Sequence, residues 1–301
     1  MPRSLARLLA IAVVSALVCV GARAQDNAAA PVTVEGFTFL GWKTFECDND
    51  VEGKKSFRIA VYRCDLFAKA VGVELKGEIG SAVDTEFVLL PPDGKRTTAK
   101  VGSPGTEAGR ATSEDQRDVE IRPFLIARTE TSQRIYDKLG GPHRDFMFPG
   151  PLNPVENASW DDAQEWFKAN PGPRLSLPSE GAWEYACRGG TTTPFYFGST
   201  IQQERVTYNG IFPYRPGDPK GKFRGPTTPV ASLPANAFGL FDTHGNVWEW
   251  CKEVHPSGSG LVSRGGSASS GASYCRSASR NGADSALRTG IIGFRASRSL
   301  P

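Results

Sequence analysis

Residues 238–250 have the sequence FGLFDTHGNVWEW, the first of three stretches that decide the fold of this chain. Gly245 lets the backbone bend here, because glycine adopts conformations that other residues avoid. Trp248 and Trp250 follow closely, and large aromatic side chains bury much apolar surface when they pack. The stretch therefore predicts a bent, densely packed segment, and this structural role is independent of whatever chemistry the protein performs.

Two other stretches are equally distinctive. Residues 174–190 read RLSLPSEGAWEYACRGG, and the third stretch begins at Arg264-Gly-Gly-Ser267 and ends at Gly293-Phe-Arg295. Residues 154–160, PVENASW, lead into a predicted helix. Together these motifs resemble the formylglycine-generating enzyme family, also called the sulfatase-modifying factor family. The resemblance covers residues 84–298.

The resemblance implies an α+β fold, the formylglycine-generating-enzyme fold, which is related to the C-type lectin fold and has little regular secondary structure. The composition agrees independently, since 33 glycines and 22 prolines favour a loop-rich protein. We expect a signal peptide over residues 1–24, an N-terminal lead-in and β-rich segment over residues 25–83, and the sulfatase-modifying-factor-like domain over residues 84–298.

Capping residues and apolar spacing predict helices over residues 133–139, 160–169 and 180–188. The middle helix has Ser159 as its N-cap and Asp162 at the capping-box position. Ala163, Trp166 and Phe167 would form its buried face. From residue 190 onward we expect short strands and many turns.

Alternating apolar residues predict strands over residues 37–42, 57–62, 86–92 and 119–126, a short helix over residues 65–70, and a polar surface loop over residues 93–118. The part before residue 80 spans only about 50 residues, which is small for an independent core. We therefore expect a disulfide to stabilise it, or docking onto the rest of the chain.

Residues 1–24 predict a secretory signal. Arg3 and Arg7 precede an apolar run over residues 8–20, and Ala22-Arg23-Ala24 matches the small-x-small cleavage pattern. The run is shorter than the about 20 residues that a membrane-spanning helix needs. An uncleaved anchor and a lipoprotein signal at Cys19 are the alternatives. We expect an exported protein, periplasmic or extracellular, with no membrane span in the mature chain.

The charge balance argues against nucleic-acid binding. The chain has 35 basic and 32 acidic side chains, and three arginines but no acids lie within the predicted signal. Because the remaining chain is neutral, it lacks the basic excess that is typical of nucleic-acid binders.

Five cysteines follow the signal: Cys47, Cys64, Cys187, Cys251 and Cys275. An exported protein can form disulfides. Because the number of these cysteines is odd, at least one thiol stays free or pairs with another molecule. Cys47 and Cys64 lie together in the N-terminal part, so we expect them to pair. Whether Cys187 pairs with Cys251 or with Cys275 stays open.

The resemblance implies catalytic chemistry around residues 265–275. The family enzyme uses molecular oxygen, and copper(I) held by two thiolates, to oxidise a sulfatase cysteine within C-x-P-x-R to formylglycine. Its two cysteines follow the pattern G-G-S-x-x-C-x-x-x-x-C. Here Cys275 matches the second cysteine, and Ser270 replaces the first. Copper(I) prefers soft thiolates to a protonated hydroxyl, so we do not expect a complete copper site.

The candidate catalytic residues are Cys275, Ser270, Ser267, Tyr274 and Trp250, and Cys275 is the candidate copper ligand. A structural role for Cys275, in a disulfide or as a buried thiol, is the alternative. The resemblance also implies a calcium site, formed by the Glu249 carboxylate with the carbonyls of His244, Gly245 and Val247. Oxygen ligands suit calcium. The alternative for Glu249 is a buried, hydrogen-bonded acid.

Two functions therefore compete. The first is a non-catalytic binding or accessory protein, in which aromatics such as Trp250 and Tyr274 line a groove for a protein or peptide, such as a sulfatase, or for a glycan. The second is an oxygen-dependent oxidoreductase that converts a sulfatase cysteine to formylglycine, or a related periplasmic maturation enzyme. The missing first cysteine favours the binding protein.

Overall fold

The structure is a computed structural model that describes residues 29–72 and 83–301. The predicted signal over residues 1–24 lies outside the described residues. The strands are β1 (Phe37–Asn49), β2 (Gly53–Cys64), β3 (Glu86–Leu90), β4 (Thr97–Val101), β5 (Arg117–Ile121), β6 (Phe124–Ala127), β7 (Trp248–Val254), β8 (Leu261–Arg264), β9 (Arg280–Ala283), β10 (Ile292–Gly293) and β11 (Ser297–Ser299). The helices are α1 (Asp65–Val71), α2 (Gln133–Lys138), α3 (Trp160–Ala169) and α4 (Glu180–Arg188), with 3-10 turns η1 (Val83–Thr85), η2 (Thr112–Glu114) and η3 (Ala272–Cys275).

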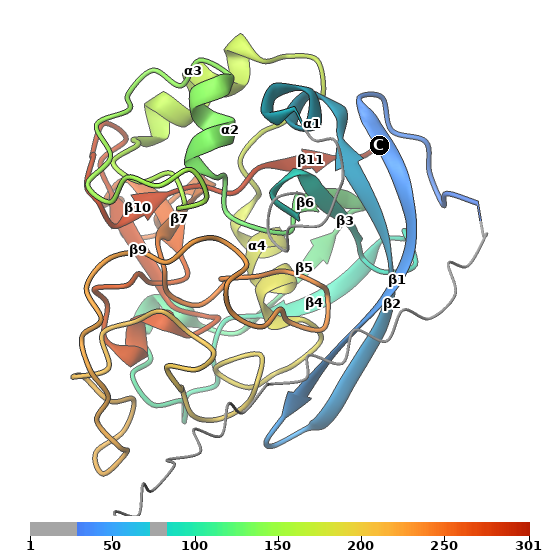
Figure 1. Ribbon diagram of the computed structural model, residues 1–301. Helices are drawn as coiled ribbons and strands as arrows, with labels where there is room; N and C mark the ends of the chain where they lie inside the picture. The colour runs from blue at the N-terminus through green and yellow to red at the C-terminus, as the bar shows by residue number, and fades with distance from the viewer. Residues whose placement is uncertain (1–28, 73–82) are drawn as a thin grey trace, which may run out of the picture.

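The central element is a five-stranded antiparallel sheet with the order β1-β2-β3-β6-β11 (Figure 1). Successive side chains of a strand point to opposite faces, and both faces of this sheet are covered. On β3, Phe87 and Leu89 join one apolar cluster with α1, α2 and α3, whereas Val88 and Leu90 join another with α4. This alternation explains why β3 is a nearly continuous apolar run.

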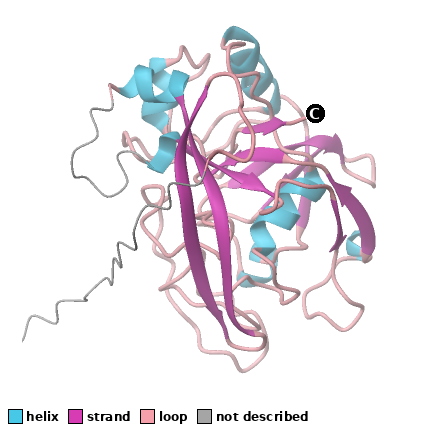
Figure 2. Cartoon of the chain, turned by 90° about the vertical axis from the view of Figure 1, so that its right-hand side faces the viewer, coloured by secondary structure: helices cyan, strands magenta, loops and turns pink. Residues whose placement is uncertain are grey.

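The N-terminal strands extend this sheet. β1 and β2 form a long hairpin, visible in Figure 2 as the paired strands that run the height of the molecule. Both strands are longer than the segments over residues 37–42 and 57–62 that the sequence predicts. β2 pairs with β3, so the expected docking onto the rest of the chain takes the form of a shared sheet.

The predicted Cys47–Cys64 pair is wrong, because the hairpin register separates the two residues. Cys47 lies opposite Lys55 near the tip, whereas Cys64 lies opposite Phe37 at the base. At 3.3 Å per residue, the strand between Lys55 and Cys64 spans roughly 30 Å. All five cysteines of the described residues are buried free thiols.

Two predictions between residues 93 and 126 are also corrected. Within the stretch expected to be a loop, β4 forms a two-stranded ribbon with β5. The single strand expected over residues 119–126 is divided into β5 and β6 by Arg122-Pro123. Because proline has no amide hydrogen to donate, it interrupts the ladder at this point.

The helices form as the sequence predicts. Ser159 and Asp162 make the reciprocal hydrogen bonds of a capping box at the start of α3. Ala163, Trp166 and Phe167 are buried in the cluster beneath it. α4 ends at Gly189, which adopts the left-handed conformation that favours glycine. No helix of the described residues is long and apolar enough to cross a membrane.

Candidate functional site

A second sheet carries the segment that contains Cys275. It has the order β10-β7-β8-β9, and β8 leads directly into residues 265–276, which we call the site loop. Within the site loop, Ser267 is buried and Ser270 is half-buried. The Oγ atoms of the two serines lie 2.9 Å apart, and the Ser267 amide donates to the Ser270 Oγ at 3.0 Å. The Ser270 hydroxyl, at the position where the family pattern predicts a cysteine, is therefore hydrogen-bonded within the loop.

Cys275 lies at the end of η3 and is completely buried. It packs with Phe195, Tyr208 and other aromatic residues, and its Sγ contacts the Gly271 carbonyl at 3.8 Å. Burial raises the pKa of the Cys275 thiol to about 12. Since the thiolate is the nucleophile and the metal ligand, Cys275 is an inert thiol near neutral pH.

The two candidate aromatics lie in different places. Tyr274 is 58% exposed beside Cys275. Trp250 is fully buried in the main core, where its Nε1 donates to the Ala158 carbonyl at 3.0 Å. The prediction that Trp250 lines a groove is therefore wrong. The alternation of β7 and the packing of α3 place this side chain beneath the sheet, away from solvent.

His244 joins the predicted calcium segment to the site loop. Its Nε2 accepts from the Tyr196 amide at 3.1 Å, so its Nδ1 carries the hydrogen and donates to the Cys275 carbonyl at 2.7 Å. Burial lowers the pKa of His244 to about 3, which keeps the ring neutral. The side chain thus acts as a structural bridge behind Cys275.

Glu249 lies in a buried acidic cluster. Its carboxylate accepts from Arg295 at 2.7 and 3.0 Å and from the Trp183 indole at 2.7 Å. Burial, followed by the carboxylates of Asp242 and Glu249, raises the pKa of Glu130 well above its usual value. Burial likewise raises the pKa of Asp242, to about 6. Arg295 therefore pairs directly with Glu249, and its charge also acts on the neighbouring Glu130 and Asp242.

The sequence analysis did not identify Glu130 or Asp242, because a single acid carries no motif. Glu130 is bonded by the Asn246 amide at 2.7 Å and by the Val247 backbone amide at 3.2 Å. It thus fixes the bend after Gly245. Among residues 29–72 and 83–301, no group of three or more His, Cys, Asp and Glu side chains is arranged to hold a metal ion. A metal here would need backbone carbonyls as ligands.

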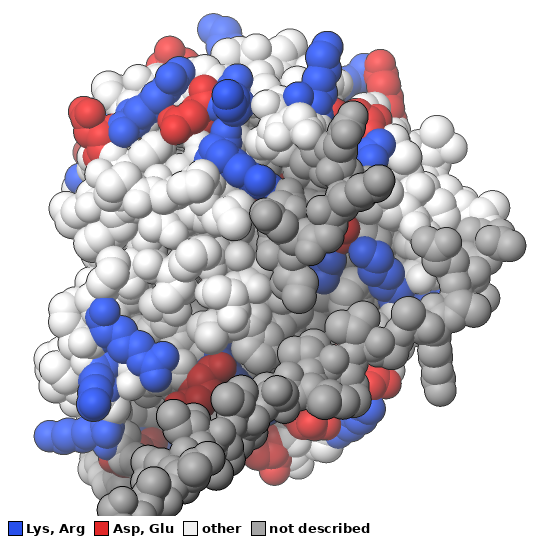
Figure 3. All heavy atoms as spheres, in the orientation of Figure 1, with Lys and Arg blue, Asp and Glu red and all other residues white. Residues whose placement is uncertain are grey.

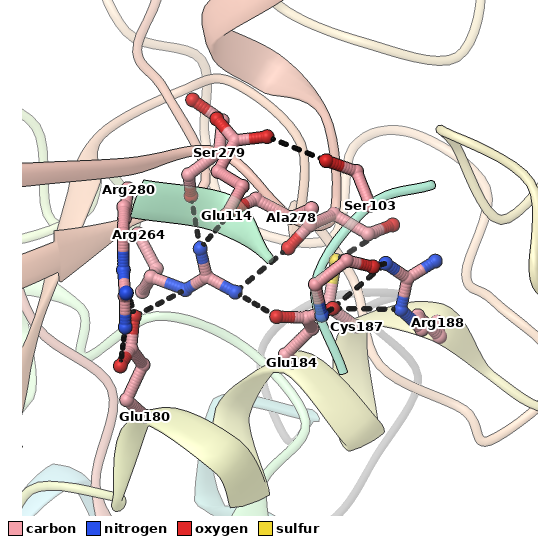
Figure 4. Close-up of polar contacts among 12 residues, drawn as sticks. Ser103, Glu114, Glu180, Glu184, Cys187, Arg188, Arg264, Ala278, Ser279 and Arg280 are labelled. Atoms are coloured by element: carbon pink, nitrogen blue, oxygen red, sulfur yellow. Dashed lines mark hydrogen bonds and ion pairs between the residues drawn. The ribbon is translucent and has the colours of Figure 1, made fainter. Parts of the chain in front are cut away.

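A buried ion network positions the segment that follows Cys275 (Figure 4). Arg264 of β8 pairs with Glu184 of α4 and donates to the carbonyls of Ser277, Ala278 and Ser279. The same Glu184 accepts from Arg188 at 2.7 Å. Removing one partner of such a buried pair typically costs about 3–5 kcal/mol. The network therefore ties β8 and residues 277–279, which flank the site loop, to α4.

Arg276 fixes the other end of the site loop. Its guanidinium donates to Glu107 and Glu114 at 2.7 Å each, and both carboxylates are buried. Glu107 and Glu114 come from the polar segment between β4 and β5. This segment therefore supports the site loop through two buried ion pairs, a role that its polar, surface-like composition did not indicate.

A cavity of about 340 Å³ lies next to the site loop. Tyr208 and Tyr214 line it and also belong to the aromatic cluster around Cys275. The Asn209 amide donates to the Ser270 carbonyl at 2.9 Å, which joins the wall of the cavity to the site loop. The cavity therefore lies beside the cluster that buries Cys275, and Glu204, Asp218 and Lys220 bring charged groups to its wall.

Comparisons with known proteins identify relatives of this chain. The formylglycine-generating enzyme of Bos taurus is 35% identical over 170 residues, covering 48% of this chain and 44% of the bovine protein. The inactive C-alpha-formylglycine-generating enzyme 2 of Bos taurus is 40% identical over 99 residues, covering 32% of each protein. This chain therefore matches less than half the length of either relative.

A solved structure has the same fold. PvdO from Pseudomonas aeruginosa superposes with a TM-score of 0.59 and 25% identity, covering 71% of this chain and 94% of PvdO. Residues 83–300 match the sulfatase-modifying factor enzyme 1-like domain. They include the site loop, the acidic cluster and α4, and exclude the N-terminal hairpin. The chain thus belongs to the formylglycine-generating enzyme, or sulfatase-modifying factor, family.

Proposed function

We propose that this protein binds a segment of a partner protein without oxidising it. The observation that carries the proposal is Ser270, which takes the position that the family pattern gives to its first cysteine and whose hydroxyl is bonded to Ser267 at 2.9 Å. A hydroxyl is too hard a ligand for copper(I), and one remaining cysteine cannot form a two-thiolate site. The residues present therefore do not fit copper, and we derive no step through it.

The burial of Cys275 supports the same proposal. Its thiol is closed off by aromatic side chains and stays protonated at neutral pH. A relative that is called inactive in its own name shares 40% identity over part of the domain. We propose that the partner is an exported protein, such as a sulfatase, that meets this chain after secretion. A glycan is the alternative ligand.

A substitution at position 270 tests the proposal. The purified protein is given copper(I), oxygen and a C-x-P-x-R peptide, and mass spectrometry follows the peptide cysteine. We expect the wild type to leave the cysteine unchanged. Ser270→Cys should bind copper(I) at least about tenfold more tightly than the wild type in competition with a chromogenic chelator, because it restores the second soft ligand.

Ser269→Cys is the matched control, since it adds a thiol to the exposed neighbouring position. It should gain no comparable copper affinity. Conversion of the peptide cysteine to an aldehyde by the wild type would contradict the proposal. It would favour the alternative, an oxygen-dependent oxidoreductase of the formylglycine-generating type.

We also propose that calcium binds next to Glu249. The carboxyl groups of Glu130, Asp242 and Glu249 are buried close together, Arg295 pairs with Glu249, and burial raises the pKa values of Glu130 and Asp242. A divalent cation with oxygen ligands would favour the ionised forms of these acids. The Glu249 carboxylate and the carbonyls of His244, Gly245 and Val247 would hold it. Calcium would act structurally here, by neutralising charge behind the site loop.

A further inference from the structure

The loop beside the cavity carries a concentrated positive charge. Residues 215–224, RPGDPKGKFR, contain four cationic residues and one acid, and we call them the basic loop. Its net charge of +3 equals that of the whole chain. Arg215, Lys220, Lys222 and Arg224 are all exposed. Figure 3 shows basic side chains gathered over the loops at the lower left of the face.

These cations lack internal counterions. Elsewhere on the surface, exposed lysines face carboxylates, as in the pairs Lys54–Glu46 and Lys100–Asp118. Among the described residues, none of the four cations of the basic loop lies within ion-pair distance of a carboxylate. The single acid of the loop, Asp218, instead accepts from the Arg215 backbone amide at 3.0 Å. Arg224 donates to the Gln203 carbonyl at 3.2 Å and Arg215 lies over the Tyr214 ring, so Lys220 and Lys222 are the cations that best suit an external anion.

The basic loop is held in place at its base. Buried Gln203 donates to the Lys222 carbonyl at 2.6 Å and accepts from the Lys222 amide at 2.9 Å. Gly210 and Gly221 exchange backbone hydrogen bonds with their neighbours here, and any side chain at either position would collide with Gln203. A site that is ordered before binding loses less entropy when its ligand arrives.

Apolar surface adjoins the charge. The cavity of about 340 Å³ is bounded by Tyr208, Tyr214 and Lys220, with Glu204 and Asp218 as the acids on its wall. A second cavity of about 160 Å³ shares Thr200 and Gln202 with it and reaches the tip of the β1–β2 hairpin. The two cavities therefore adjoin, but Asp48 and Asp50 line the second one, so an acidic segment would occupy the larger cavity.

Exposed aromatics continue this surface toward the site loop. Phe212 and Tyr274 are 59% and 58% exposed, and the Phe212 carbonyl accepts from the Ala272 amide at 3.2 Å. Aromatic side chains next to unpaired cations form a surface that suits a ligand with both apolar and acidic groups.

We propose that the basic loop is the docking site for an acidic, aromatic-containing segment of the partner protein. The inference rests on the proposed binding function and specifies its ligand. Acidic side chains of the segment pair with Lys220, Lys222 and their neighbours, and an apolar side chain enters the larger cavity. A long polyanion fits less well, because the charge is confined to ten residues and Glu204 faces the same cavity.

Fluorescence anisotropy with the full mature protein tests this. The probe is a short fluorescein-labelled peptide of glutamate and tyrosine, compared with the same peptide carrying lysine in place of glutamate. We expect the acidic peptide to bind at least about tenfold more tightly, and its affinity to fall as salt is raised. The double variant Lys220→Glu/Lys222→Glu should weaken this binding at least about tenfold.

The matched control reverses two exposed lysines elsewhere, Lys69→Glu/Lys95→Glu, and should bind the acidic peptide like the wild type. Equal affinity for the two peptides, or equal loss in both variants, would overturn the proposal. So would tight binding of heparin or single-stranded DNA without binding of the acidic peptide. The mass-spectrometric assay for aldehyde formation tests the proposed non-catalytic function, and the anisotropy assay tests the docking site. Aldehyde formation would contradict the non-catalytic function even if the acidic peptide binds as expected.

Discussion

Cys275, which matches a cysteine of the family pattern, is a buried thiol whose raised pKa keeps it protonated at neutral pH. The reason lies in the packing of the site loop. Gly265 and Gly266 adopt positive φ values of 96° and 78°, which turn the backbone so that Cys275 packs directly against it. A Cβ on Gly266 would come within 2.7 Å of the Cys275 Sγ. The glycine pair thus determines how deeply the thiol is buried.

Gly266→Ala should destabilise the protein by about 2–4 kcal/mol. The new methyl group collides with the Cys275 Sγ, and alanine also resists the left-handed backbone. Urea unfolding at neutral pH measures the loss. Gly217→Ala is the control, because Gly217 has a positive φ of 94° but no atom within 4 Å of the added Cβ. It should cost only about 1–2 kcal/mol. An equal loss of unfolding free energy in both variants would mean that the Cys275 side chain shifts to accommodate the new methyl group without destabilising the protein.

At the scale of the element, α3 shows how much of this fold can be predicted locally. The capping box, the apolar spacing and the end of the helix all follow from neighbouring residues. Arg288 was not predictable in this way. It lies far along the chain, yet it donates to both carboxylate oxygens of Asp162 at 2.7 Å. Long-range partners of this kind depend on the assembled fold.

Asp162→Asn should lower the free energy of unfolding by about 1–2 kcal/mol at pH 7, since it weakens the cap and the Arg288 pair. Burial alone raises the pKa of Asp162, but hydrogen bonds from Arg288 and Ser159 hold it below its usual value. The carboxylate therefore stabilises the fold above the pKa of an unfolded aspartate and loses this effect as the pH falls through its folded pKa.

The difference between the Asp162→Asn variant and the wild type should accordingly shrink at pH 3, in urea unfolding at the two pH values. Asp161→Asn removes a neighbouring acid outside the capping box and should have less effect at either pH. An Asp162→Asn difference that stays constant down to pH 3 would show that ionisation of Asp162 does not stabilise α3.

The elements that sequence patterns missed share a physical cause. β4 alternates half-buried and exposed positions over a mostly polar sequence, so no apolar signal marks it as a strand. Trp250 was assigned to a groove because a pattern of large aromatics does not reveal which layer will cover them. Cys47 and Cys64 are close in sequence, but the length of the hairpin separates them. In each case the outcome depends on which distant segment pairs with or packs against the residue, and a local sequence pattern does not contain this information.

At the scale of the whole molecule, the two sheets meet around the buried acids and Arg295. Arg295 lies between β10 and β11 and donates to Glu249 of β7, to the Ala127 carbonyl of β6 and to the Phe241 carbonyl. The charge balance at this junction therefore affects the stability of both sheets together. Calcium bound here would stabilise the entire domain.

Adding calcium to protein treated with EGTA should raise the midpoint of thermal unfolding by about 5 °C or more. Selective binding to the folded state stabilises it by about 2.7 kcal/mol at a hundredfold excess over the dissociation constant, which corresponds to such a shift for a domain of this size. Magnesium should have less effect, because it demands stricter octahedral geometry. Identical midpoints in calcium and EGTA would contradict the calcium proposal.

The order of strands in the large sheet also bears on how the protein is made. Among the strands of the described residues, β1, at one edge of the sheet, is synthesised first, and β11, at the opposite edge, is synthesised last. The sheet therefore stays incomplete until almost the whole chain has been synthesised. Closing this edge requires β11 to pair with β6 across more than half of the chain, and pairing between such distant segments is intrinsically slow during folding.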